Sequence, residues 1–203
     1  NIDNGLSELT EKVQKFKDNR ELLKPNIEAD SFLSLVKEVE TIKQLISKID
    51  GSSYMYLSEN FKDNQRTSLH GKVSQKIAEI RNELLFFSLW FKNLDDENAK
   101  RLIESSGLYR YYLESLRKFK DFTLQEREEK IINLKDISGN AAMVRISDMI
   151  RNSFTFPWEG KEVTQAELMT NVRNPDKSKR HAAYNLLLKR YEQTGDVIAE
   201  IYK

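Results

Sequence analysis

Metal-dependent hydrolysis needs residue types that are scarce in this sequence. Zinc hydrolases of the His-Glu-x-x-His type place two imidazoles one helical turn apart, beside a carboxylate that activates water. The 203 residues contain only His70 and His181, which lie far apart in the sequence, and neither opens such a pattern. Cysteine is absent, which excludes disulfides and thiolate zinc sites. We therefore assign no metal ligand and no catalytic residue, and we interpret both histidines as surface or partly buried side chains.

Other catalytic patterns are equally poorly supported. No two glycines lie close enough for a phosphate-binding loop, so we assign no cofactor-binding residue. Serine chemistry would need a positioned base, and Gly51-Ser-Ser53 is more typical of a helix-ending turn than of a nucleophile. Acid pairs such as Glu38 with Glu40, or Glu128 with Glu129, suit glycoside cleavage in principle, but solvated helix faces explain them.

The most unusual charge feature is a basic stretch near the end of the sequence. No acid interrupts it between Asp176 and Glu192, and it suits an acidic partner. The net charge of only +1 argues against a dedicated nucleic-acid binder, and a solvated face or an inter-domain contact is the preferred interpretation. The basic residues are Arg173, Lys177, Lys179, Arg180, Lys189 and Arg190.

Aromatic side chains gather in two stretches at helical spacing, Phe86 to Phe91 and Tyr109 to Tyr112, and both are expected to supply core side chains. Tyr109, Tyr111 and Tyr112 can in addition place hydroxyl groups at a surface or a cleft.

The sequence as a whole predicts an all-α fold, an array of long antiparallel helices. Glycine and proline number only 7 and 3, and apolar residues recur three or four positions apart. Residues 84–91 are apolar on nearly all sides, which predicts the centre of the core. One small β-hairpin is expected near residues 153–163. Expected helices cover roughly residues 4–22, 31–50, 53–61, 69–91, 95–107, 108–122, 123–151, 164–172 and 175–203.

Several helix ends carry recognisable signals. Capping boxes are predicted at Thr123 to Glu126 and at Thr164 to Glu167, and Asp95 is a predicted N-cap. Gly51 is expected to end a helix that Asp30 or Ser31 caps. Further on, Asn174 is expected to cap the last helix, with Pro175 at its first position.

We interpret residues 1–203 as a single helical domain with a first half, 1–107, and a second half, 108–203, that holds the hairpin. The apolar pattern still runs at Lys203, so we expect the natural chain to continue. The longest apolar stretch is far shorter than the ~20 residues that cross a bilayer, and no signal segment opens the chain. We expect no membrane partner and a cytoplasmic location.

The chain resembles the N-terminal helical domain of oligoendopeptidase F, a branch of the thimet-type zinc endopeptidases (family M3). The resemblance covers roughly residues 30–203 and lies in the order and spacing of helical segments. These segments are Leu84 to Leu89, Leu108 to Phe119, Phe122 to Glu129, Ser153 to Phe156, Glu162 to Leu168 and Asn171 to Tyr184.

The resemblance implies that these helices form one wall of a deep channel that admits short, unfolded peptides. In that family the His-Glu-x-x-His zinc site lies downstream, in a separate catalytic part, so no ligand or catalytic residue transfers to this chain. The resemblance thus implies zinc outside this chain, a C-terminal catalytic domain as its partner, and no activity of this chain alone. The alternative is a free-standing interaction module that binds an acidic partner through the basic helix 175–203.

Overall fold

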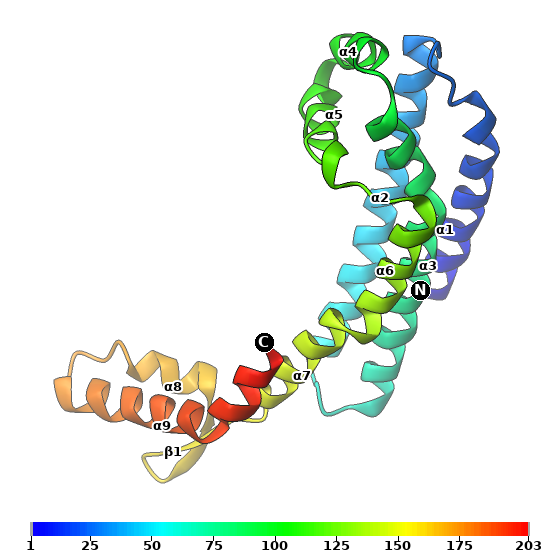
Figure 1. Cartoon of the computed structure of the whole chain (residues 1–203). Coiled ribbons are helices and arrows are strands. Elements are labelled where there is room, and N and C mark those ends of the chain that lie inside the picture. Colours follow the sequence, from blue (N-terminus) through cyan, green and yellow to red (C-terminus); the bar gives the residue numbers. More distant parts are fainter. Residues whose placement is uncertain (1, 203) are drawn as a thin grey trace. The chain divides into compact units, whose positions relative to one another are not determined.

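A computed structural model describes residues 2–202 of the chain (Figure 1). The chain divides between Ile137 and Ser138 into two compact units. The described residues are almost entirely helical, with one two-stranded antiparallel sheet, so the predicted all-α fold with a small hairpin is confirmed. No helix within residues 2–202 is both long and apolar enough to span a bilayer.

Three long helices form the frame of the first unit: α1 (Ile2–Lys17), α2 (Ala29–Ser58) and α3 (Asn64–Asn93). A short 3-10 segment, η1 (Asp18–Leu22), follows α1. Short connections make successive helices run in opposite directions, and each of the three packs against the other two. Gly51 does not end a helix, as was predicted, because α2 continues through it to Ser58. Buried Ile49 and Leu57 on either side of this glycine keep the helix packed on its neighbours.

Five shorter elements complete the first unit. They are α4 (Asp96–Glu104), η2 (Gly107–Tyr109), α5 (Arg110–Arg117), η3 (Lys120–Phe122) and α6 (Glu126–Ser138). Leu102 of α4 and Leu113 of α5 are fully buried in the same core as the long helices. Gly107, with φ +56°, is therefore a turn inside this unit. The boundary between the two compact units lies at 137/138. The two halves described from the sequence meet instead at 107/108.

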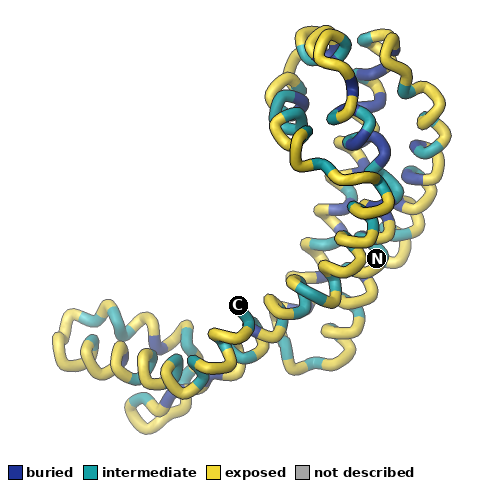
Figure 2. The backbone as a smooth tube through the Cα atoms, in the orientation of Figure 1, coloured by how far each residue is buried: buried dark blue, intermediate teal, exposed yellow. Residues whose placement is uncertain are grey.

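The core of the first unit is built around phenylalanine rings from three helices. Phe32 of α2 stacks on Phe87 and Phe91 of α3, with ring centroids 5.9 and 5.4 Å apart. Phe16 of α1 meets Phe87 edge-on at 5.8 Å. Such contacts add to the large apolar area that each ring buries. The predicted core segment 84–91 is partly right, because Phe86, Phe87, Leu89 and Phe91 are buried and the other four residues are half-buried. Figure 2 shows the buried positions concentrated along these helices.

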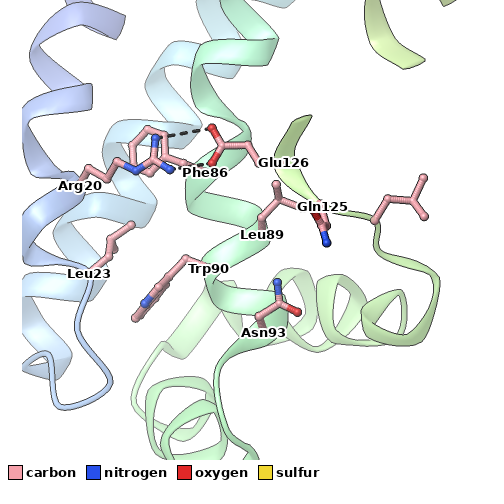
Figure 3. A pocket seen from close by; sticks show the side chains of 9 residues that line it. Arg20, Leu23, Phe86, Leu89, Trp90, Asn93, Gln125 and Glu126 are labelled. Atoms are coloured by element: carbon pink, nitrogen blue, oxygen red, sulfur yellow. Dashed lines mark hydrogen bonds and ion pairs between the residues drawn. The ribbon is translucent and has the colours of Figure 1, made fainter. Parts of the chain in front are cut away.

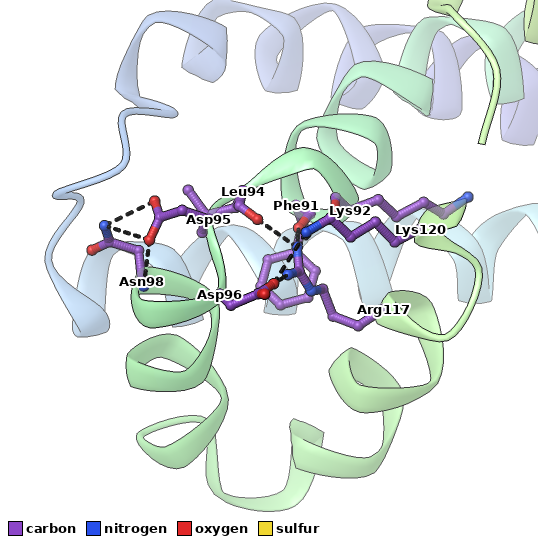
Figure 4. A network of polar contacts seen from close by, with 8 residues as sticks. All are labelled: Phe91, Lys92, Leu94, Asp95, Asp96, Asn98, Arg117 and Lys120. Atoms are coloured by element: carbon purple, nitrogen blue, oxygen red, sulfur yellow. Dashed lines mark hydrogen bonds and ion pairs between the residues drawn. The ribbon is translucent and has the colours of Figure 1, made fainter. Parts of the chain in front are cut away.

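Arg117 of α5 closes the carboxyl end of α3 (Figure 4). Its Nη1 donates to the carbonyl oxygens of Phe91, Lys92 and Leu94 at 3.2, 2.6 and 2.6 Å, and its Nη2 pairs with Asp96. These carbonyls have no partner in the helix, and a cation at this end also suits the helix dipole. The Arg117 side chain is only 13% exposed, so α5 is anchored to α3 by a largely buried guanidinium.

The second unit holds α7 (Asn140–Asn152), strands β1 (Thr155–Trp158) and β2 (Lys161–Thr164), and helices α8 (Gln165–Asn171) and α9 (Lys177–Ile201). The strands pair with Thr155 opposite Thr164 and Trp158 opposite Lys161. Glu159 and Gly160 have φ of +49° and +78°, the conformation of a type I′ hairpin turn. The small hydrophobic core of this second unit comprises Phe154, Phe156, Leu168 and Ala183.

The helix-cap predictions had mixed outcomes. Asp95 caps α4, accepting from the amide of Asn98 at 2.9 Å, and Thr164 with Glu167 forms the predicted capping box. The box at Thr123 is wrong, because the Thr123 hydroxyl donates to the carbonyl of Phe119 and α6 begins only at Glu126.

Two other predicted caps are also wrong. Glu28, which makes no side-chain cap bond, precedes α2 in place of Asp30 or Ser31. The N-cap of α9 is Asp176, whose carboxylate accepts from the amide of Ser178 at 2.8 Å, and not Asn174. In both cases the chain offers several polar residues in succession, so the sequence leaves the capping position open.

Candidate functional site

Neither histidine lies in a metal-binding group. Within residues 2–202 no three His, Cys, Asp or Glu side chains gather so as to hold an ion, so the described residues do not fit zinc. His70 of α3 lies against Ser53 and Tyr54 of α2, whereas His181 lies beside Asn185 on exposed α9. The two residues belong to different units.

The structure does bring a serine and a histidine together. Ser53 Oγ lies 2.9 Å from Nδ1 of His70, but it also donates to the carbonyl oxygen of Asp50 at 2.8 Å. A hydroxyl carries one proton, so while Ser53 donates to Asp50 it can only accept from Nδ1 of His70, which in that arrangement is not its base. Ser53 lies within α2 and is only 1% exposed. The pair therefore holds α2 against α3, and Ser53 is not assigned as a nucleophile.

One recess of the first unit is a groove between α2, α3 and α5, which we call the tyrosine groove. It consists of two adjoining hollows of ≈ 500 and ≈ 380 Å³ that share Val39, Lys43, Ser47 and Tyr112. The first hollow is further lined by Val36, Glu40, Gln44 and Tyr109, and the second by Ile46, Arg81, Leu84, Leu85, Phe87 and Ser88.

Polar groups in the tyrosine groove are held in place by its aromatic side chains. The hydroxyl of Tyr109 donates to Oε2 of Glu40 at 2.5 Å, and this bond, with some burial, raises the pKa of Tyr109. Nζ of Lys43 donates to the hydroxyl of Tyr112 at 2.8 Å and lies 4.7 Å from the centre of its ring. Each pair joins α2 to a segment 69 residues further along the chain.

Of the three tyrosines expected in the core with hydroxyls at a surface or cleft, Tyr109 and Tyr112 pack against the core and line a groove. The core prediction is wrong for Tyr111, which is 76% exposed. The groove itself was not predicted from the sequence. The usable signal was the repeat of Glu40 with Lys43 and of Tyr109 with Tyr112, three positions apart, which places each pair on one helix face.

A second pocket lies where η1 and the start of α6 meet α3 (Figure 3). The guanidinium of Arg20 lies 5.2 Å from the centre of the Phe86 ring and donates to both carboxylate oxygens of Glu126. Hydrogen bonds from Lys130 and then Arg20 lower the pKa of Glu126. Its polar groups are thus already paired with one another, and the pocket offers no unpaired charge to a ligand.

The acid pairs singled out in the sequence also have structural roles. The Glu38 carboxylate accepts from the side-chain amide of Asn19, and the Glu40 carboxylate accepts from the hydroxyl of Tyr109. Glu128 and Glu129 accept from backbone amides that precede α6, at 3.0 and 3.1 Å. None of them forms a pair suited to glycoside cleavage.

The basic stretch does not form one free surface. Arg180 donates to the carbonyls of Asn174 and Pro175, and Lys179 pairs with Glu159 at 2.7 Å. Arg190 lies 5.0 Å from the centre of the Phe154 ring. These side chains hold α9 to the hairpin and the preceding loop, which weakens the alternative of an acidic partner.

Helix α6 exposes apolar side chains and attaches through polar ones. Asn133 donates to Oδ1 of buried Asn82, which in turn donates to the carbonyl of Lys130. No described residue of α6 is buried, whereas Ile131, Ile132 and Leu134 are 50, 51 and 47% exposed. An exposed apolar helix face is typical of a surface that contacts another protein segment.

Taken together, these features define a helical scaffold with a polar-ended groove and, among residues 2–202, no metal-binding cluster. A family model described as Oligopeptidase F, which represents N-terminal domains of M3 peptidases, matches residues 90–156. The solved structure of oligoendopeptidase-F from Enterococcus faecium is similar over 98% of this chain, with a TM-score of 0.78 and 17% sequence identity. No curated protein sequence matches.

These two findings confirm the predicted resemblance to the N-terminal domain of an oligoendopeptidase F-like protein. The family match includes the end of α3, all of α4 to α7 and the start of the hairpin. The chain spans 41% of the length of the Enterococcus protein.

Proposed function

We propose that this chain is a helical channel-wall domain of a cytoplasmic, zinc-dependent oligoendopeptidase that hydrolyses short peptides. The observation that carries the proposal is the agreement between the family match and the fold similarity to oligoendopeptidase-F. The described residues do not fit zinc, so the metal and the catalytic groups are assigned to another part of the protein. This chain then contributes shape: rigid packed helices that exclude folded proteins and a surface that holds an extended peptide.

The exposed apolar face of α6 supports a protein partner. Ile131, Ile132 and Leu134 would lose water by packing against the catalytic part of the same protein, worth about 25 cal/mol per Å² of apolar surface buried. In this arrangement α6 is the docking helix of the wall domain. The alternative of an interaction module that uses α9 is less well supported, since Lys179, Arg180 and Arg190 are bound within their own unit.

Activity measurements on two proteins test this function. The full-length protein encoded by the gene is expected to cleave quenched fluorescent peptides of up to about ten residues, to lose this activity with a chelator, and to leave folded proteins intact. The 203-residue chain alone is expected to show no turnover with zinc added. Chelator-sensitive turnover by this chain, or no peptide cleavage by the full-length protein, would overturn the proposal.

The docking role of α6 is tested separately with Ile131→Asn/Ile132→Asn in the full-length protein. Loss of the apolar contact is expected to lower peptide turnover at least ~10-fold, corresponding to about 1.4 kcal/mol. Leu108→Asn is the control, because Leu108 is an apolar residue of the same unit that is 100% exposed. Equal activity of the double variant and the control would remove α6 as the docking helix.

A further inference from the structure

The positive charges in the tyrosine groove are only weakly paired by contacts within the chain. Within residues 2–202 Lys43 forms no ion pair with a carboxylate, and its ammonium donates to the neutral hydroxyl of Tyr112. Arg81, the second cation of the groove, is 59% exposed and lies 3.9 Å from Asp50, at the limit of an ion pair. Glu40, by contrast, is already bonded to Tyr109.

These charges give the groove two different ends. Glu40 lines only the first hollow and Arg81 only the second, while Lys43 lines both. Val39, Leu84 and Leu85 supply an apolar floor between them. A ligand that matches this pattern has a donor or positive end, an apolar middle and a negative end.

We propose that the tyrosine groove binds the carboxyl-terminal end of a short peptide, with the free carboxylate on Lys43 and Arg81. Peptide N–H groups or the amino end then face Glu40, and apolar side chains lie on the floor. Tyr112 orients the Lys43 ammonium by its hydroxyl and its ring face, so that little side-chain freedom is lost on binding.

The terminal carboxylate is favoured over an acidic side chain by the proposed function, on which this inference rests. Every short peptide has a free carboxyl end whatever its sequence, so a site that recognises this end selects by length and not by side chain. A groove of this size holds a few residues, in keeping with a short ligand.

Calorimetric titration of the 203-residue chain with apolar tetrapeptides tests the proposal. The free acid is expected to bind, and the C-terminal amide to bind ~10-fold more weakly, because a hydrogen-bonded charge pair is lost. Lys43→Gln is expected to weaken the free acid to the level of the amide and to leave the amide unchanged. Lys37→Gln is the matched control, since Lys37 is an exposed lysine of α2 outside the groove.

Three results would overturn the proposal: equal binding of acid and amide, no binding of either, or a Lys43→Gln variant that binds like the control. Tight binding of an amidated peptide with an internal Glu would overturn the choice of the terminal carboxylate. The full-length protein separates this failure from that of the proposed function. If it cleaves acid and amide peptides with the same KM while retaining chelator-sensitive activity, the groove assignment fails and the oligopeptidase function stands.

Discussion

Nη2 of Arg20 lies 2.6 Å from Oε2 of Glu126, which joins the segment after α1 to the first residue of α6, 106 positions further along the chain. The pair lies against the ring of Phe86 and is reinforced by Lys130, whose Nζ lies 2.8 Å from the other carboxylate oxygen. It is one of the contacts that hold α6 to the rest of its unit.

A double-mutant cycle on Arg20→Met and Glu126→Gln is expected to give a coupling free energy of about 0.2–1 kcal/mol, the range of exposed ion pairs. Urea unfolding followed by Trp90 fluorescence in a Trp158→Phe background reports on this unit alone, because each unit contains one tryptophan. The exposed pair Lys100 and Glu104, 3.9 Å apart, is the control and should show less coupling.

The same pair predicts a dependence of stability on pH. The pKa of Glu126 is lowered in the folded chain, so its contribution is present above the ordinary Glu pKa of about 4.3. That contribution is lost as the pH falls through the lower folded value. The Glu126→Gln variant should therefore lose less stability than the wild type between pH 6 and pH 3, and identical profiles would contradict the assignment.

Arg117→Ala is expected to lower the free energy of unfolding of the first unit by about 3 kcal/mol, because charged hydrogen bonds to the end of α3 are lost. Arg117→Lys should recover less than half, since one ammonium cannot replace the branched guanidinium. Lys118→Ala, the next residue and exposed, is the control and should change stability by less than about 0.5 kcal/mol. Chemical unfolding followed by Trp90 measures all three.

Two Gly→Ala substitutions are expected to act in opposite directions. Gly51 lies within α2 with open space around a new Cβ, so Gly51→Ala should stabilise the first unit by about 0.5–1 kcal/mol. Gly160 also has open space, but its φ of +78° strains any L side chain, so Gly160→Ala should cost about 1–2 kcal/mol. Unfolding followed by Trp90 and by Trp158 measures the two units. A stabilising Gly160→Ala would contradict the assigned turn.

Thr164→Ala should destabilise the second unit by about 1 kcal/mol through loss of the capping box at the start of α8. Hydrogen bonds from the backbone and hydroxyl of Thr164 lower the pKa of Glu167, so the cap is present above the ordinary Glu pKa and weakens as the pH falls through the folded value. Thr164→Ser is the control and should retain both the cap and its acid dependence. Thermal unfolding at pH 7 and pH 3 checks both statements.

Most helix positions and much of the core followed from the sequence, because apolar spacing reports directly on burial. The hairpin before α8 is the clearest case, and in the aromatic segment that ends α3 four of eight residues are buried. The helix predicted over residues 123–151 is instead two helices that meet at Gly139. Helix ends were predicted less accurately from the sequence. Thr123 matched a capping pattern, yet its hydroxyl donates to the carbonyl of Phe119. Gly51 carried a stop signal, which packing of buried residues on both sides overrides.

The tyrosine groove could not be predicted from the sequence, because it is formed by contacts between segments that lie far apart along the chain. Tyr109 and Tyr112 meet Glu40 and Lys43 across 69 residues, and only the docking of α5 on α2 and α3 brings them together. Local patterns gave each pair a shared helix face but could not identify the partner. The Ser53 and His70 pair shows the opposite case, since the structure unites two residues of catalytic type and assigns them to packing.

The attachment of α6 to α3 through Asn82 and Asn133 has a consequence for local opening. A helix that buries no described side chain loses little hydrophobic contact when it detaches, so its amide hydrogens exchange with solvent through openings far smaller than global unfolding. Exchange protection in the isolated chain should fall abruptly from α3 to α6. A partner seated on Ile131 and Ile132 would slow that exchange and convert a loosely held segment into part of a shared core.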